Sequence, residues 1–515
     1  MKRTASLQTL AMVVGMGFVL LFAFLALKRL LYPFELTWLE SYIYAPVLHC
    51  LRGQPIYEAP SFNYTSCNYP PLYFNLSALF SKALGLGADA GSFVPLRLVS
   101  LLSTSMTFVA LLGLLHFRHR IDWRIAVALA AVYPASFGRF EGWLDSSRVD
   151  PLMCLLFFLA TAFLIEGRGW RSAVLAGLLS GLAGLAKQPA LVYIAGIGLF
   201  LAVVHGQWKR ILLAASIAAV LALGYLAMTG DLFNHYFYYW LFEIPSHHPR
   251  YWKYILRGLG FLAITVPILL VVGLFPLLET VRRARSRAAW QALPAWTAAL
   301  AITTLCALLL RTKQGASINF FMPVFLLAAV AAVEVASRHV GKYLVIKPLF
   351  ALGCIVQLLM LAYDPRPLLP TAADVQEART IVSSLRAVDG PVWFGTFPAY
   401  AVSAGKPWVL QDAALLDLPA SFVTNELSKS ISLGTFGAIV LPENETLVAP
   451  EFIERFYQAV QLPTLPPTFL RALHGNHFVG KIYVRREILP SFLDRIQPLF
   501  KDRKVLLQDS TVLGR

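Results

Sequence analysis

The stretch ELTWLESYIYAPVLHCLRGQPIYEAP, residues 35–60, decides how the rest of the chain is interpreted. It directly follows a hydrophobic run at 7–27, and a run of about 20 apolar residues is long enough to cross a membrane. The stretch itself mixes aromatic side chains with the carboxylates of Glu35, Glu40 and Glu58. Carboxylates beside a membrane segment are costly there, so they point to a function.

The composition is that of an integral membrane protein. Hydrophobic residues make up 57% and charged residues 14% of its 515 residues, and the mean hydropathy is +0.63. An ordinary soluble domain has more polar surface than this. Lys2 and Arg3 precede the run at 7–27, and no small-x-small cleavage signature follows it, so we expect a retained signal anchor.

Further apolar runs of spanning length follow along the chain. We expect spans at 7–27, 92–115, 149–165, 211–228, 258–278, 294–310, 319–336 and 344–362, a short one at 125–138, and two within 172–204, broken at Lys187-Gln188-Pro189. The expected fold is therefore mostly α, with about 11 transmembrane helices.

Lysine and arginine concentrate in alternate loops. The loops predicted to lie inside hold 15 basic residues, counting Lys2 and Arg3, as the positive-inside rule requires. An odd number of spans then places the C-terminus outside. We expect a multi-pass protein of the cell (inner) membrane.

The last third has a different character. From Asp364 to Arg515 there are 15 acidic and 15 basic residues, so the net charge of +16 belongs to the membrane part. We predict helices at 374–388, 421–433 and 450–460 that alternate with strands at 391–396, 438–442 and 479–484. The expected domains are a membrane domain at 1–362 and an extracytoplasmic α/β domain at 363–515.

Charge and cysteine content limit the partners. The basic residues are spread over membrane-flanking loops and not over one soluble face, which favours lipid headgroups or phosphates and argues against nucleic acid. Cys50 and Cys67 share one outer loop and could form a disulfide or remain free thiols. No His or Cys lies at zinc-ligand spacing. We expect no metal site and no cofactor, since a divalent metal has no support in the sequence.

The first outer loop, 28–91, is far longer than a connector needs to be. Within it, 38–51 and 71–84 carry apolar residues at helical spacing but are too short to cross. Both are expected to be helices that lie in the membrane interface.

The motifs of this loop resemble those of the GT-C-fold glycosyltransferases, membrane enzymes that take sugars from polyprenyl-phosphate carriers and include protein O-mannosyltransferases and lipid A aminoarabinose transferases. The matching elements are Glu40, Tyr44, the turn Gly53-Gln-Pro-Ile-Tyr57, and Tyr69-Pro70-Pro71. The sequence departs from the family at Leu39, where many relatives carry Asp.

Three later segments resemble the same family. They are Ser147-Arg148-Val-Asp150-Pro151, Gly181-Leu-Ala-Gly-Leu-Ala-Lys187-Gln188-Pro189 and Lys313-Gln-Gly315-Ala-Ser-Ile-Asn319. The resemblance covers about 30–336 and leaves the C-terminal domain out. It implies an inverting transferase in which the matched Tyr44, Tyr57, Tyr69 and Asn319 bind substrate.

Such a transfer needs a carboxylate that takes the proton of the attacking hydroxyl, and cations that hold the leaving phosphate. Glu40 is the expected base, with Glu35 second. Lys187, Arg311, Lys313 and Arg148 are the expected phosphate-binding residues, and Arg257 could assist.

Each residue also has a structural interpretation. Glu40 could be a solvated carboxylate or a partner for Arg52, and Lys187 could extend along the membrane surface. Arg311 and Lys313 could be ordinary charges at the end of a span, and Arg148 and Asp150 could form a capping pair. His247 and His248 fit an aromatic interface belt better than a metal site.

The leading hypothesis is an inverting membrane glycosyltransferase that moves a monosaccharide from a polyprenyl-phosphate carrier to a glycan, lipid or protein acceptor of the cell envelope. The alternatives are a lipid-linked sugar transporter or flippase and a non-catalytic scaffold. A transporter would show internal repeats and mid-membrane charges, whereas here the charges gather at the ends of spans.

Overall fold

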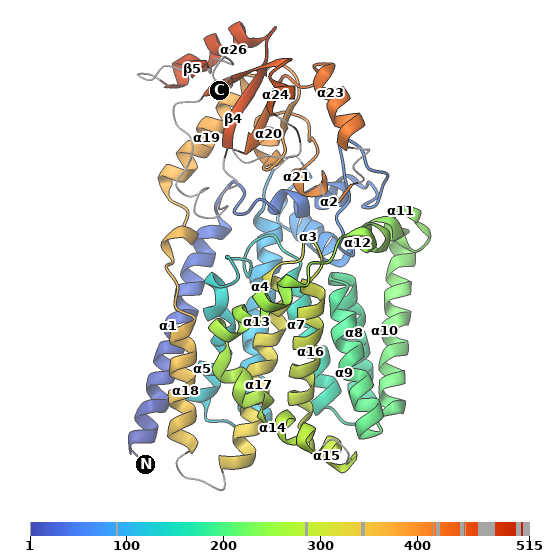
Figure 1. Ribbon diagram of the computed structural model, residues 1–515, viewed down its shortest axis with the longest axis vertical. Helices are drawn as coiled ribbons and strands as arrows, with labels where there is room; N and C mark the ends of the chain where they lie inside the picture. Colours follow the sequence, from blue (N-terminus) through green and yellow to red (C-terminus); the bar gives the residue numbers. More distant parts are fainter. Residues whose placement is uncertain are drawn as a thin grey trace.

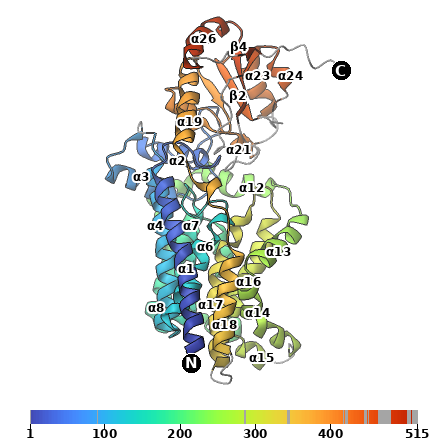
Figure 2. The ribbon, with the colours of Figure 1, turned by 90° about the vertical axis from the view of Figure 1, so that its left-hand side faces the viewer.

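A bundle of helices carries a small α/β domain at one end (Figure 1). The computed structural model describes residues 2–88, 91–283, 287–340, 346–415, 417–418, 423–442, 448, 450–461, 479–500 and 506–507. The N-terminus lies at the end of the bundle away from this domain (Figures 1 and 2). We call the end beneath the domain the capped end.

The helices of the bundle account for most of the expected membrane segments. They are α1 (Lys2–Leu30), α4 (Val94–Gly113) with the π-helical turn η2 (Leu114–Arg118), α5 (Trp123–Ala130), α6 (Val132–Ala135), η3 (Ser136–Gly138), α7 (Asp150–Glu166), α8 (Gly169–Ala186), α9 (Pro189–His205), α10 (Trp208–Thr229), α13 (Lys253–Thr265), α14 (Pro267–Arg282), α15 (Arg287–Ala292), α16 (Ala295–Arg311), η6 (Ile318–Phe321), α17 (Met322–Val340) and α18 (Ile346–Met360).

Five of the described helical segments are long and apolar enough to cross a membrane: Ala5–Leu30, Val94–Arg118, Gly169–Ala186, Trp208–Thr229 and Ile318–Arg338. Shorter apolar helices accompany them at Pro189–His205, Ala295–Arg311 and Pro348–Met360. The mostly helical, polytopic fold class is confirmed, whereas the count of eleven spans stays a prediction.

The predicted span at 258–278 is instead two helices. α13 and α14 meet at an angle of 108°, and Pro267 begins the second of them. A proline ring clashes with a helical conformation of the preceding residue. Val266 accordingly has φ −140° and ψ 34°, which breaks the helix there.

α17 is the central helix of the bundle. In its apolar window 83% of the residues are buried, against 11% in α10, which lies at the edge of the bundle (Figure 1). Alanines and valines from Ala328 to Val333 have no exposed surface, so neighbouring helices pack around the whole circumference. This central helix starts at the capped end, directly after η6, the short turn that contains Asn319.

Two helices of the first loop, α2 (Glu40–Arg52) and α3 (Leu72–Ala83), lie between the bundle and the α/β domain (Figures 1 and 2). α2 ends at Gly53, whose φ of 69° is the left-handed conformation that glycine adopts at helix ends. Four short helical turns follow α10 on the same side: η4 (Asp231–Phe233), α11 (His235–Tyr238), η5 (Tyr239–Glu243) and α12 (Ile244–His247).

The α/β domain contains one five-stranded sheet of order β1-β2-β4-β3-β5. β1 and β2 pair in parallel, with Trp393 opposite Ile439, and the other pairs are antiparallel. Its elements are η7 (Arg366–Leu368), α19 (Ala372–Arg386), β1 (Val392–Phe394), α20 (Pro398–Ser403), α21 (Asp412–Leu415), η8 (Val423–Leu427), α23 (Ser428–Ser432), β2 (Ala438–Pro442), α24 (Pro450–Ile453), β3 (Tyr457–Gln461), β4 (Val479–Arg485), α26 (Leu489–Ile496), η9 (Gln497–Phe500) and β5 (Leu506–Leu507).

The three predicted strands are present, but the predicted helix at 450–460 is wrong in its second half. α24 ends at Ile453, and Tyr457–Gln461 forms β3, which pairs with β4. Gln458 and Val460 face Val484 and Ile482 across the pair. The pairing partner lies far along the chain, and it overrides the local helical pattern.

Candidate functional site at the capped end

A buried cluster around Asp150 joins three separate segments of the bundle. Asp150 is the first residue of α7, and its Oδ1 accepts hydrogen bonds from Lys187 Nζ at 2.6 Å and Asn319 Nδ2 at 2.8 Å. Arg148 Nε lies 3.6 Å from the other oxygen, Oδ2. All four side chains are at most 5% exposed. The three family-like motifs of the sequence therefore meet in one place.

Two polar atoms of this cluster accept no hydrogen bond within the described part of the chain. They are Asp150 Oδ2 and Asn319 Oδ1, both fully buried. A buried polar atom without a hydrogen bond costs about 1–3 kcal/mol. Such atoms commonly mark a position where a water or a ligand group completes the hydrogen bonds.

Aromatic rings surround the Lys187 ammonium. Its Nζ lies 5.2 Å from the ring centre of Tyr69 and 5.1 Å from that of Phe320, within the range of a cation–π interaction. Tyr57 donates its hydroxyl to the carbonyl of Tyr69 at 2.7 Å. Of the tyrosines expected to bind substrate, Tyr69 thus lies beside Lys187, and the buried Tyr57 supports the backbone of Tyr69.

Tyr44 occupies a different position. It is buried, and its ring packs against Phe93 with 5.0 Å between ring centres. Its substrate-binding role stays a prediction, and the structure shows it as part of the core that supports α2.

Further cations lie near this cluster. The Arg311 guanidinium stacks over the Tyr254 ring at 4.5 Å, and Arg257 approaches the same ring at 5.3 Å. Lys313 forms an isolated β-bridge with Arg250. Burial lowers the pKa of Lys313, and the positive charge of Arg250 lowers it further. None of these four cations has a carboxylate within 4 Å in the described ranges.

The contacts of Glu40 differ from those expected of a catalytic base. Arg97 Nη2 and Nε donate to its two oxygens at 2.6 and 3.0 Å, and the backbone N–H groups of Leu36 and Ser147 and the Ser147 hydroxyl donate at 2.6, 2.8 and 2.9 Å. Burial raises the pKa of Glu40, but the Arg97 charge and these hydrogen bonds more than offset it, so the pKa lies below its ordinary value. A fully buried, fully hydrogen-bonded carboxylate is poorly placed to accept a substrate proton.

Glu35 is also fully buried. Burial raises its pKa well above the ordinary value, the Ser41 hydroxyl that donates to Oε1 lowers it, and the nearby Glu40 raises it further. A carboxyl in this environment is stable in its neutral form. The structure therefore places Glu35 inside the protein, next to Ser41.

The α/β domain contributes a carboxylate that the sequence did not single out. Asp417 Oδ2 accepts hydrogen bonds from Asn68 Nδ2 at 2.7 Å and the Tyr42 hydroxyl at 3.2 Å, and Oδ1 lies 2.9 Å from His248 Nε2. Gln188, next to Lys187, donates to the Asn68 carbonyl at 2.8 Å. No motif surrounds Asp417, and only the tertiary fold shows this contact.

A second carboxylate missed by the sequence belongs to the loop before α7. Glu141 has φ 54°, a left-handed conformation that costs a side-chain-bearing residue about 1–2 kcal/mol. Its side chain is exposed, yet the surrounding protein raises its pKa, while the charges of Arg148 and Arg311 lower it in part.

The cysteines are all free thiols, so Cys50 and Cys67 form no disulfide. Cys67 instead approaches the carbonyl of Tyr42 at 2.5 Å. His247 is exposed, and its neighbour His248 contacts Asp417. The expectation that the site holds no metal or cofactor stays a prediction.

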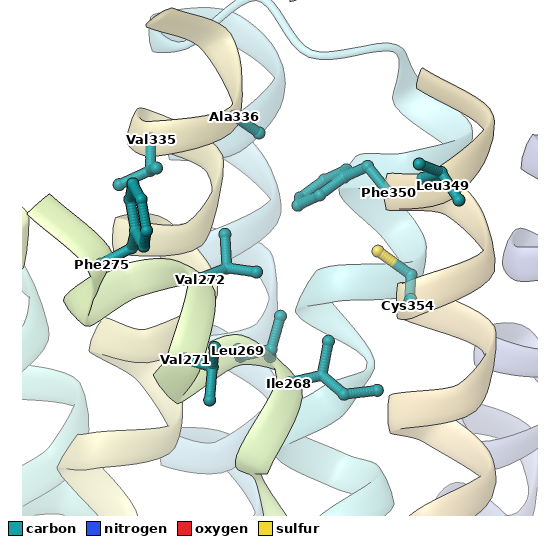
Figure 3. Close-up of a pocket in the computed structure, with 11 residues that line it drawn as sticks. Ile268, Leu269, Val271, Val272, Phe275, Val335, Ala336, Leu349, Phe350 and Cys354 are labelled. Carbon is teal, nitrogen blue, oxygen red and sulfur yellow. The ribbon is translucent and has the colours of Figure 1, made fainter. Parts of the chain in front are cut away.

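A separate cavity of about 380 Å³ lies between α14, α17 and α18 (Figure 3). Its walls are apolar, with Phe275, Val335 and Phe350 among them. Val335 lies 16 residues beyond Asn319, which corresponds to about 24 Å along a helix. Since this cavity offers no charged group and is remote from Asp150, it does not belong to the site.

No protein-family model matches the sequence, and a comparison with curated proteins gives no match either. Solved structures do match. The apo structure of ArnT from Cupriavidus metallidurans superposes with a TM-score of 0.54 at 14% identity, over 91% of this chain and 98% of that one. The same protein bound to undecaprenyl phosphate gives a TM-score of 0.51 at 15% identity, over 83% and 93%.

The apo oligosaccharyltransferase of Archaeoglobus fulgidus gives a TM-score of 0.55 at 13% identity, over 93% of this chain and 74% of that one. The chain therefore has the GT-C fold. A match over 93% of the chain reaches well beyond residue 336, where the sequence resemblance ends, and so includes most of the α/β domain.

Proposed function

We propose that this protein is an inverting glycosyltransferase of the cell (inner) membrane, which moves a monosaccharide from a polyprenyl-phosphate carrier to a cell-envelope glycan, lipid or protein. The capped end and its α/β domain would face the outside of the cell. The structure of ArnT with undecaprenyl phosphate supports a carrier of this class, as does an Archaeoglobus fulgidus oligosaccharyltransferase structure with a dolichol-phosphate.

The observation that carries the proposal is the surplus of positive charge at the capped end. Lys187 lies beside Asp150, while Arg311, Lys313 and Arg257 have no carboxylate within 4 Å in the described ranges. Arg311 and Lys313 are partly buried, and a cation without a counter-charge is costly in such a position. A phosphate group would neutralise them through charge-assisted hydrogen bonds.

In the proposed reaction the acceptor hydroxyl attacks the anomeric carbon while the bond from that carbon to the carrier phosphate breaks. The cations are held before the reaction begins, so they stabilise the developing phosphate charge without rearranging. Lys187 is fixed by Asp150, and Arg311 donates to the carbonyl of Ala316 at 2.5 Å. A single displacement inverts the anomeric configuration.

The remaining predicted residues receive supporting parts in this proposal. Tyr69 forms the aromatic wall near the sugar and Tyr57 holds its backbone, while Asn319 offers its unpartnered Oδ1 to a substrate hydroxyl. In place of the catalytic role expected from the sequence, we assign Glu40 the structural task of joining the first loop to Arg97 and Ser147. The Asp417 segment of the α/β domain borders the site and would help to hold the acceptor.

The test is a turnover assay with the purified full chain in lipid nanodiscs. A panel of undecaprenyl-phosphate-linked hexoses, pentoses and amino sugars is supplied with an envelope lipid extract or water as the acceptor, and released undecaprenyl phosphate is measured. Lys187→Met should lower turnover by about 10- to 100-fold, the value of a charge-assisted hydrogen bond of about 1.5–3 kcal/mol.

Lys209→Met is the matched control, because Lys209 is an exposed lysine in the first turn of α10. It should leave turnover unchanged. Failure of the folded wild-type protein to release undecaprenyl phosphate from any donor would refute the proposed function. Adding a metal chelator in a parallel arm tests the prediction that no metal is needed.

A further inference from the structure

The proposed transfer requires a base, and most carboxylates of the capped end already have strong partners. Glu40 is paired with Arg97, Asp145 with Arg29 at 2.8 Å, and Asp150 with Lys187. Asp417 accepts from Asn68 and Tyr42 and lies beside His248. A carboxylate in such an arrangement would have to give up a partner before it could accept a substrate proton.

Glu141 is different. Its side chain is exposed and makes no hydrogen bond and no ion pair within the described residues. The loop of Glu141 contacts a cation expected to bind phosphate, since the Arg148 guanidinium lies 3.9 Å from the ring centre of Trp143, two residues along the chain. The charges of Arg148 and Arg311 also act on the Glu141 carboxylate. Arg148 also lies next to Asp150 at 3.6 Å, so the loop of Glu141 and the buried cluster share one guanidinium.

The strained conformation of Glu141 is fixed by its neighbours. Arg139 Nη2 donates to the carbonyls of Met360 and Ala362 at 2.9 Å each, on one side of Glu141. On the other side Arg29 Nη2 donates to the Gly142 carbonyl at 2.9 Å. Backbone strain that several contacts hold in place is typical of functional positions.

We propose that Glu141 is the general base of the transfer. The carboxylate accepts the proton of the acceptor hydroxyl as the acceptor oxygen bonds to the anomeric carbon. The electron pair of the broken bond leaves with the carrier phosphate, which Arg148 and Arg311 neutralise. This assignment rests on the proposed function, and it adds a residue that no motif of the sequence contains.

The strained backbone of Glu141 allows a test in which one variant should raise the unfolding temperature and lower the transfer rate. A purely structural role of Glu141 would not separate these two quantities. Glu141→Gly relieves the left-handed conformation. We expect it to unfold at a higher temperature than the wild type while its transfer rate falls by about 100-fold or more, the usual contribution of a general base. Glu141→Gln keeps the side-chain size and should lose transfer to the same extent while binding undecaprenyl phosphate as the wild type does.

The control is Glu243→Gln, because Glu243 is an exposed carboxylate of η5 that forms no ion pair within the described residues. It should transfer at the wild-type rate. In the wild type the acidic limb of the pH–rate profile should report the base, and the residual activity of Glu141→Gln should lack this limb. Retention of at least one third of wild-type turnover by Glu141→Gln would overturn the assignment and leave the proposed function standing, whereas a wild type that turns over no donor refutes both.

Discussion

Replacing Arg97 by methionine should destabilise the protein strongly, because it leaves the buried carboxylate of Glu40 without its counter-charge. Arg97 is fully buried and donates to both oxygens of Glu40 and to the carbonyls of Arg29, Tyr32 and Phe34. Removing one member of a buried ion pair costs about 3–5 kcal/mol. At 1.4 kcal/mol for each factor of ten, the unfolding equilibrium constant should rise by roughly 100- to 4,000-fold.

The assay is reversible unfolding of the purified protein in mixed detergent micelles, followed by tryptophan fluorescence. Arg118→Met is the matched control, because the Arg118 side chain is 53% exposed in its ion pair with Glu166 and such pairs contribute about 0–1 kcal/mol. In a double-mutant cycle, Glu40→Gln should recover part of the loss caused by Arg97→Met. A cost below 1 kcal/mol for Arg97→Met, equal to the control, would refute the structural role of this pair.

Three other perturbations have expected outcomes that follow from the geometry. Gly142→Ala should cost more unfolding free energy than Gly206→Ala, although both glycines have a left-handed φ, of 73° and 68°. At Gly206 a Cβ meets no atom within 4 Å, so the cost should be only about 1–2 kcal/mol. At Gly142 a Cβ would also lie 2.8 Å from Nη2 of Arg29, whose guanidinium is held by Asp145, and equal losses for the two variants would contradict this. The raised pKa of Glu35 means that the folded protein holds the Glu35 proton more tightly than the unfolded chain does. The free energy of unfolding therefore falls as pH rises above the pKa of the unfolded chain. Glu35→Gln should remove this fall when unfolding is measured from pH 4 to 8, and an unchanged pH slope would contradict the expectation. Asp417→Asn should make the α/β domain more susceptible to limited proteolysis, because the domain loses its charged contact with the loops below, and an unchanged cleavage rate would argue against that contact.

Hydrophobic runs predicted much of the bundle because the membrane itself imposes their length. The break at Lys187-Gln188 also matched, since α8 ends at Ala186 and α9 starts at Pro189. The bend at Val266 was missed, although Pro267 was visible, because an apolar run on both sides of a proline is compatible with one kinked span.

The site was predictable only in part, since its chemistry depends on partners distant in sequence. Motifs drew attention to Lys187 and Asn319, and both reach Asp150. Glu40 was found for its motif but given the wrong environment, because Arg97, its partner 57 residues away, carries no signature. Glu141 was missed because its distinguishing feature is a backbone angle, which hydropathy and spacing do not encode.

The proposed transfer requires that the capped end holds the phosphate of a polyprenyl carrier. The most direct measurement is a cryo-electron microscopy structure of the protein in nanodiscs with undecaprenyl phosphate. We predict phosphate density within hydrogen-bonding distance of Lys187 or Arg311, with the lipid tail leading from the capped end into the membrane. Phosphate density at another position, with both of these side chains arranged as in the absence of the lipid, would contradict a phosphate site at the capped end.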